Sequence, residues 1–210
     1  MALISSNRLV VFDLETTGLD TERDAVIQIG AVAIDQCLRE VSNFEVKVRF
    51  DHQAASPLAL QVNSFKEGTW EREAVSEREA ACRFAAFLKE NATLRRQTKN
   101  GKPFFVAEIA AYNASFDGPF LHAWYERMGE FLPASFLAVC IMQRVQWFFL
   151  ESPERERPVD LKLQTVAKFL GVKLSNAHDA LSDSRASANV YREILFRTRR
   201  QAGRAKRKKL

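Results

Sequence analysis

The stretch VVFDLETTGLD, residues 10–20, decides the fold of this 210-residue chain. Its first half predicts a buried strand, and residues two apart on a strand project from the same face, so Asp13 and Glu15 are expected side by side. Two anions in a partly buried setting repel each other and raise each other's pKa unless metal ions neutralise them. An Asp-x-Glu pattern is also typical of an ordinary strand end, so the rest of the chain has to decide between these interpretations.

Two further strands are expected at residues 25–35 and 44–50, and the short connections predict an antiparallel meander. After an irregular stretch to residue 70, strands alternate with helices, which predicts an α/β fold with a mixed five-stranded sheet of antiparallel and parallel strands. Asp13 and Glu15 then lie at the carboxyl end of a central strand, where such sheets usually carry their sites. The remaining expected strands cover residues 104–112 and 136–141, the expected helices cover residues 76–90, 115–128, 142–149, 161–170 and 179–196, and residues 151–160 are expected to form a surface loop.

Two more acidic positions extend the pattern. Asp117 follows the predicted strand 104–112 at the start of a helix that Ser115 is expected to cap, although an acid in a first turn is also favoured by the helix dipole alone. Near the C-terminus, His178 and Asp183 are five residues apart, which is about 140° around a helix. The two side chains converge only if His178 lies in the loop before the helix and folds back over it.

The charge of the chain is uneven. The net charge is +5, but the last 14 residues contain eight basic residues and no acid, so residues 1–196 carry −3. We expect one domain of residues 1–196 followed by a disordered basic tail, residues 197–210, which is either a plain solvated terminus or an extension that holds phosphates. A second basic stretch, residues 94–102, surrounds Asn100 and Gly101; it is either a solvated turn or, if it flanks the site, a contact for a phosphate backbone.

Other features narrow the class of protein. Cys37, Cys82 and Cys140 show no CxxC spacing, which argues against a zinc cage or a disulfide framework. No segment has the length of a membrane span or the pattern of a secretory signal, so we expect a soluble, cytoplasmic protein that does not bind a membrane. A metabolic phosphate-binding domain would need a glycine-rich loop after a strand, and the chain has none.

Taken together, three blocks resemble the motifs of the DEDDh exonucleases, relatives of the proofreading subunit of bacterial replicative polymerases, which have a ribonuclease H-like fold. Residues 12–18, FDLETTG, resemble the first motif; residues 113–117, NASFD, the second; and residues 178–183, HDALSD, the third. The resemblance covers about residues 8–195. Each block alone is a modest signal, but three blocks in the right order on compatible strands and helices argue against coincidence.

The resemblance implies a metal-dependent 3′-to-5′ exonuclease that releases nucleoside 5′-monophosphates. Carried over by position, Asp13, Glu15 and Asp183 would hold one divalent cation, and Asp13 with Asp117 would hold a second, both Mg²⁺ or Mn²⁺. His178 would be the general base that activates a water. Five residues would contact the substrate or brace the site: Thr16, Thr17, Gly18, Leu19 and Asn113. Leu19 is also explained more simply as a core or loop leucine, and Asn113 equally well as a turn residue.

The substrate is less defined than the chemistry. The segment 60–65, LQVNSF, lacks the His-Gly-Ile-like stretch that approaches the nucleotide in relatives, so Phe65 and Trp70 are candidates for base stacking or, more simply, for core packing. Single-stranded or frayed DNA is the expected substrate by analogy with proofreading enzymes, with a polymerase or another replication or repair protein as a possible partner. An exoribonuclease of the same family and a noncatalytic nucleic-acid-binding or polymerase-tethering module are the alternatives. The sequence does not define an oligomeric state.

Overall fold

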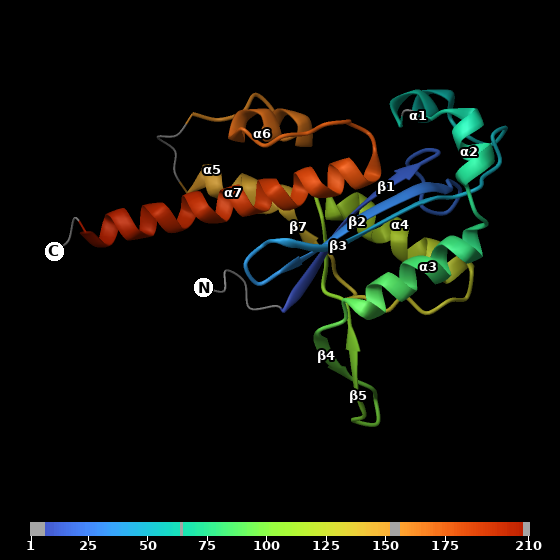
Figure 1. Cartoon of the computed structure of the whole chain (residues 1–210), viewed down its shortest axis with the longest axis horizontal. Coiled ribbons are helices and arrows are strands. Elements are labelled where there is room, and N and C mark those ends of the chain that lie inside the picture. Colours follow the sequence, from blue (N-terminus) through green and yellow to red (C-terminus); the bar gives the residue numbers. More distant parts are fainter. Residues whose placement is uncertain (1–6, 64, 152–155, 208–210) are drawn as a thin grey trace.

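A mixed five-stranded sheet forms the centre of the molecule (Figure 1). The computed structural model describes residues 7–63, 65–151 and 156–207. Strands β1 (Arg8–Thr16), β2 (Val26–Asp35) and β3 (Glu40–Lys47) form an antiparallel meander, and β6 (Ile109–Ala111) and β7 (Val139–Cys140) add parallel to β1, in the order β3-β2-β1-β6-β7. The expected fold class is therefore confirmed, including the combination of antiparallel and parallel strands.

Helices cover both faces of the sheet because its central strands are apolar on both sides. Val10 and Phe12 of β1 pack on the side of α3 (Glu77–Glu90) and α4 (Ala114–Arg127). Leu9 and Val11 face the opposite way. They pack on the side of three helices: α5 (Ile141–Leu150), α6 (Leu163–Leu170) and α7 (Ala180–Arg207). A strand buried on both faces reads as a continuous apolar run, which is how β1 begins and how most of β2 reads.

The segment expected to be irregular up to residue 70 contains two short helices, α1 (Pro57–Val62) and α2 (Glu67–Glu73). Ser56 caps α1 and Pro57 occupies its first turn, a combination that starts helices. The apolar signal was too short to predict a helix, and α2 is held by tertiary packing of Trp70 on Ile27. Within the loop expected at residues 151–160, residues 152–155 lie outside the described ranges, as does Ser64.

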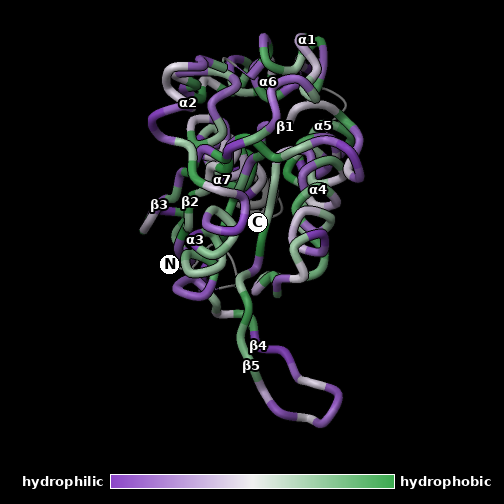
Figure 2. Tube along the Cα trace, turned by 90° about the vertical axis from the view of Figure 1, so that its right-hand side faces the viewer, coloured by the Kyte–Doolittle hydropathy of each residue, from purple (hydrophilic) through white to green (hydrophobic). Residues whose placement is uncertain are grey.

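The single strand expected over residues 104–112 is wrong. Residues 94–106 form a hairpin of β4 (Leu94–Gln97) and β5 (Pro103–Val106), a separate two-stranded sheet that projects from the body (Figures 1 and 2). The chain then changes partners, because Ala107 bonds to the segment around residue 133 before β6 begins. Apolar periodicity ran through this change of partner and could not reveal it.

Several helix and strand ends also differ from expectation. Asn113 occupies the position before α4, and the Ser115 hydroxyl donates to the Asn113 side chain instead of capping the helix. Strand β7 has only two residues where residues 136–141 were expected. Helix α7 continues past Phe196 to Arg207, so residues 197–207 are helical. Arg197 pairs with Glu193 one turn earlier, which helps the helix to continue. The division into a domain of residues 1–196 and a basic tail stays a prediction.

In the described part of the chain, no helix combines the length and the apolar character needed to cross a membrane.

Candidate active site

Asp13 and Glu15 lie near the carboxyl end of β1, on the face that α7 covers. Phe12, just before Asp13, and Leu14, between the two acids, point into the core on the opposite face. Glu15 is buried and Asp13 is half-buried. The pairing of β1 with β2 shifts register directly after Glu15. Such bulges often occur next to active sites, because they re-aim a side chain.

Gly30 allows α7 to approach Asp13. It lies directly opposite Asp13 in the β1–β2 ladder, and a Cβ atom on Gly30 would lie 2.1 Å from backbone atoms of Ala180 and Leu181. The Ser184 hydroxyl donates to the Gly30 carbonyl at 2.9 Å and fixes the first turn of α7 there. The third motif thus reaches the first because one position of β2 has no side chain.

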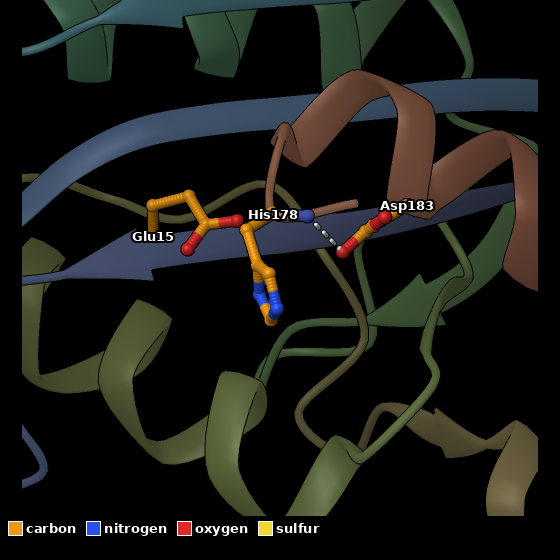
Figure 3. A group of neighbouring side chains, drawn as sticks. All are labelled: Glu15, His178 and Asp183. Atoms are coloured by element: carbon orange, nitrogen blue, oxygen red, sulfur yellow. Dashed lines mark hydrogen bonds between the residues drawn. The ribbon is translucent and has the colours of Figure 1, made fainter. Parts of the chain in front are cut away.

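His178 lies in the loop before α7, as the spacing required. Its φ is 61°, a left-handed conformation, and its backbone N–H donates to Asp183 Oδ2 at 3.2 Å. This turn brings ligand atoms of Glu15, His178 and Asp183 within 4.8 Å of one another (Figure 3). The ring Nε2 lies 3.1 Å from the amide nitrogen of Gln164 in α6, so one hydrogen bond orients the imidazole.

Asp117 reaches the site from the other face of the sheet. The β1–β6 ladder pairs Val10 with Ile109 and Val11 with Ala110, and it extends no further along β1. Beyond that point the Leu14 N–H donates to Asp117 Oδ1 at 3.2 Å. Asp117 therefore occupies the gap where the two parallel strands separate, at the start of α4. From β1 the chain continues to β2 on one side, and β6 returns on the other side, so the gap lies outside the carboxyl ends of two strands where the strand order reverses. Open sheets bind ligands at such a place.

Burial raises the pKa of all four acids, and the charges of neighbouring acids add to the rise for Asp13 and Glu15. Burial, followed by the charges of Asp183 and Asp117, raises the pKa of Glu15 to about 8. Burial raises the pKa of Asp117 to about 7, against the opposing effect of the Leu14 N–H, and that of Asp183 to about 6. Burial and the charges of Asp117, Glu15 and Asp183 raise the pKa of Asp13 well above its ordinary value. A folded arrangement of this kind favours protons or cations at neutral pH.

One fully buried side-chain oxygen of this cluster lacks a partner among the described residues. Asp183 Oδ1 is buried and accepts no hydrogen bond, although Oδ2 accepts one from the His178 N–H. An unpaired buried carboxylate oxygen is costly, and a divalent cation would satisfy it. The donor set is mainly carboxylate oxygen, which suits Mg²⁺ or Mn²⁺.

The turn after Glu15 is held by its own side chains. The Thr16 hydroxyl donates to the Gly18 carbonyl at 2.6 Å, and the Thr17 hydroxyl donates to Asp24 Oδ1 at 3.1 Å. A Cβ atom on Gly18 would lie 2.3 Å from Asp24 Oδ2, so the turn leaves little room for a larger residue. Leu19 stands at the tip with 85% of its surface exposed. It takes no part in the described core.

Two pockets meet at His178. One has a volume of about 640 Å³, and Tyr112, Asn113, Gln164 and Asp183 are among the residues that line it together with His178. The other, of about 460 Å³, lies on the side of the α2 segment, and its lining includes Gln28, Lys47, Asn63, Trp70, Asp179 and again His178. Both volumes lie in the range typical of small-molecule sites.

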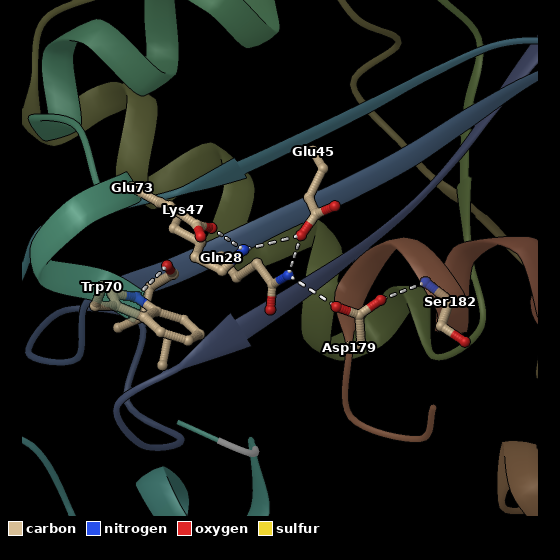
Figure 4. Close-up of polar contacts among 8 residues, drawn as sticks. Gln28, Glu45, Lys47, Trp70, Glu73, Asp179 and Ser182 are labelled. Carbon is tan, nitrogen blue, oxygen red and sulfur yellow. Dashed lines mark hydrogen bonds and ion pairs between the residues drawn. The ribbon is translucent and has the colours of Figure 1, made fainter. Parts of the chain in front are cut away.

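A chain of polar contacts supports the loop that carries His178, and the sequence did not reveal it (Figure 4). Asp179 Oδ1 accepts the Ser182 N–H at 2.9 Å, and Oδ2 accepts from the Gln28 amide at 3.2 Å. The Gln28 amide also donates to Glu45 at 2.9 Å, and Lys47 pairs with Glu45. The available signal was Gln28 itself, a polar residue inside the otherwise apolar run of β2.

The segment 60–65 serves the fold. The side chain of Asn63 is buried and donates to the Thr16 carbonyl at 2.7 Å, which ties this segment to the turn of the first motif. Phe65 and Trp70 pack together at 5.0 Å between ring centres, and Trp70 is 6% exposed. Core packing, the simpler of the two interpretations of these aromatic residues, is the one the structure supports.

The family model RNase_T, described as exonuclease, matches residues 10–191. The chain is 28% identical over 186 residues to the PolC-type DNA polymerase III of Caldanaerobacter subterraneus subsp. tengcongensis, covering 89% of this chain and 11% of the polymerase. The corresponding polymerase of Clostridium perfringens is 26% identical over 184 residues, 86% of this chain. The chain thus spans about 11% of the length of these curated relatives.

Solved structures share the fold. Escherichia coli Exonuclease I in complex with a dT13 oligonucleotide aligns with a TM-score of 0.73 and 17% identity, over 94% of this chain and 43% of that one. Exonuclease I of Methylocaldum szegediense aligns with a TM-score of 0.69 and 20% identity, over 89% of this chain and 40% of that one.

Proposed function

This chain belongs to the DEDDh-type 3′–5′ exonucleases with a ribonuclease H-like fold, and we propose that it removes nucleotides from single-stranded or frayed DNA 3′ ends. The observation that carries the proposal is the meeting of four acidic side chains at the gap between β1 and β6. They come from both faces of the sheet, and burial raises the pKa of each, with the charges of the other acids adding to the rise for Asp13 and Glu15. Such an arrangement is stable at neutral pH mainly when cations are bound.

Two divalent cations, Mg²⁺ or Mn²⁺, are the proposed cofactors. Asp13, Glu15 and Asp183 would hold one, using the unpartnered Asp183 Oδ1, and Asp13 with Asp117 would hold the other. When bound, a pair of such ions lowers the pKa of a water and stabilises the leaving 3′ oxygen. The fold holds the carboxylates close together although their charges repel one another.

His178 is the proposed general base. It belongs to the loop before α7, where its backbone is fixed by Asp183 and its ring is oriented by Gln164. A base must reach the proton that it removes while keeping a defined orientation, and the two hydrogen bonds provide this orientation. The product would be a nucleoside 5′-monophosphate.

The two pockets beside His178 give room for a nucleotide on each side of the bond that is cleaved. Asn113 lines one of them. Because the hydroxyls of Thr16 and Thr17 already bond within the turn, these residues would contact a nucleotide mainly through the backbone that they shape, with Gly18 keeping the turn tight. The exposed Leu19 would pack against a base.

DNA is the preferred substrate in this proposal because the polymerase relatives are named for DNA synthesis and an Exonuclease I neighbour holds a DNA oligonucleotide. The same relatives support a role beside a polymerase or another protein of replication or repair.

The test is digestion of 5′-labelled single-stranded DNA, frayed duplex DNA and RNA with Mg²⁺, with Mn²⁺ or with chelator. Stepwise shortening from the 3′ end that requires metal and is lost in Asp13→Asn is expected, with DNA cut fastest. Faster cleavage of RNA would replace the substrate in this proposal. Binding of all three without cleavage under any metal would refute the catalytic function.

A further inference from the structure

The β4–β5 hairpin, residues 94–106, is a part of the described structure that the proposed site does not use. It carries Arg95, Arg96, Lys99 and Lys102, all exposed, and no acidic residue. None of these four side chains forms an ion pair within the described ranges. Exposed cations without acidic neighbours keep their full charge for a ligand.

The hairpin is an ordered element. Its strands pair from Leu94 with Val106 to Gln97 with Pro103. Two backbone hydrogen bonds close the tip, from the Thr98 N–H to the Lys102 carbonyl and from the Gly101 N–H to the Thr98 carbonyl. The Thr98 hydroxyl accepts the Lys102 N–H at 3.0 Å, and Gly101 supplies the left-handed conformation that the turn requires. The tip therefore holds its lysines on a defined two-stranded ribbon.

The sign of the charge separates the hairpin from the rest of the domain. Residues 1–196 carry a net charge of −3, and without the four cations of the hairpin they would carry −7. An acidic body repels a polyanion, so its affinity for one has to come from concentrated positive elements. On this ribbon, Arg95 pairs across the strands with Phe105, which is 57% exposed, and Arg96 pairs with Phe104. Cations interleaved with aromatic faces are typical of surfaces that bind nucleic acid.

The hairpin lies beyond the amino ends of the parallel strands, whereas the acids lie near the carboxyl end of β1 (Figure 1). Followed along the strands at about 3.3 Å per residue, the path from Glu15 to Lys102 is roughly 30–40 Å. A duplex or fully stacked strand rises about 3.4 Å per nucleotide, so it needs on the order of ten nucleotides to touch both places, and a more extended single strand needs fewer.

We propose that the β4–β5 hairpin binds the phosphate backbone of the nucleic acid strand whose 3′ end occupies the active site, within about ten nucleotides of that end. The hairpin serves affinity for long substrates and has no part in the chemistry. This inference rests on the proposed function for the identity of the ligand, but its test does not need hydrolysis.

The test compares the charge reversal Lys99→Glu/Lys102→Glu with the control Arg72→Glu/Lys173→Glu, which changes the net charge equally at exposed positions elsewhere. Binding of a labelled single-stranded DNA 30-mer, and of a frayed duplex, is measured in chelator between 50 and 200 mM salt. The hairpin variant should bind the 30-mer at least fivefold more weakly than the control variant. Its slope of log affinity against log salt should be shallower by about one.

Hydrolysis of a trinucleotide with Mg²⁺ provides the second measurement, because so short a substrate cannot reach the hairpin. It should stay within twofold of the wild-type rate in both variants. Equal binding of the 30-mer by both variants would overturn the inference, and so would an equal loss of long and short substrates in the hairpin variant. If no oligonucleotide were cut by any protein, the proposed function would fail while the binding comparison still decided the role of the hairpin.

Discussion

At the carboxyl end of β1, four acidic side chains crowd into a largely buried setting, whereas the four cations of the hairpin stand in water beyond the opposite end of the strands. The acids repel one another, and the cation binding proposed for them depends on the position of each carboxylate oxygen. The four cations repel one another little in water, and the phosphate binding proposed for them depends only on the sign of their charge. Substitutions that keep the shape but remove the charge should therefore strongly reduce hydrolysis in the acidic cluster. Substitutions that keep the charge should leave DNA binding by the hairpin unchanged.

The largest effect is expected for Asp183→Asn. It removes one charge from the cluster while keeping the shape, and hydrolysis should fall by roughly 10³-fold or more, because the buried Oδ1 would lose a cation. The matched variant is Asp179→Asn in the same loop. Its oxygens already accept from Ser182 and Gln28, so we expect a loss of at most about tenfold. Equal losses in steady-state rates would show that position near α7, not cation binding, explains the effect.

Gly30→Ala tests the packing on which the acidic cluster depends. The added methyl would meet the backbone of Ala180 and Leu181 at 2.1 Å, and backbone cannot move aside cheaply. We expect destabilisation by about 3 kcal/mol in denaturant unfolding, with loss of activity. In the control Gly118→Ala, the new methyl would touch only the Ala138 side chain at 3.8 Å, so stability should be kept or rise. Similar stability of both variants would contradict the close approach of α7.

His178→Gln should reduce hydrolysis by roughly 10²-fold, since a positioned general base contributes about that much. His122→Gln is the control, because within the described residues the hydrogen bond of the His122 ring in α4 is to the Phe136 carbonyl, and this variant should keep wild-type rates. Added imidazole should restore part of the lost activity in His178→Gln. A variant that retains full activity would assign proton removal to another group.

The stability of the metal-free protein should fall as pH rises. Glu15, Asp117 and Asp183 have folded pKa values of about 8, 7 and 6, above their ordinary values of 4.5, 3.8 and 3.8. The folded state therefore binds more protons than the unfolded state between about pH 4 and pH 8, and stability is lost across this window. In chelator, Tm should be several degrees lower at pH 8 than at pH 5, and Mn²⁺ should raise it most at pH 8. Calorimetry that shows the opposite slope would contradict the crowding of the acids.

The smallest effect is expected in the hairpin. Lys99→Arg/Lys102→Arg keeps both charges on exposed positions, so binding of the DNA 30-mer should stay within twofold of wild type. A loss as large as that of the glutamate variant would mean that the hairpin makes specific contacts and would end the contrast with the acidic cluster.

Much of the fold could be predicted from local pattern. The short connections between the predicted strands of residues 8–50 predicted the meander, and Gly171 ends α6 with a φ of 74°, as a C-terminal glycine should. The errors fall where tertiary contacts override local signals. Helix α2 depends on the burial of Trp70, and β5 and β6 are separate because the chain changes partners at Ala107. Neither the burial of Trp70 nor the change of partner at Ala107 produces a hydrophobic periodicity that could be recognised in the sequence.

The sequence by itself determined which side chains are candidates for the chemistry, because the spacing of acids relative to strand ends and a helix start is a local property. Only the tertiary structure decided how they meet. Asp117 arrives from the other face because β1 and β6 separate after Val11, and Asp183 arrives because Gly30 leaves room for α7. Gln28 and Asp179 then hold the loop of His178. These contacts join residues more than a hundred positions apart, and close packing, not local preference, selects such pairs.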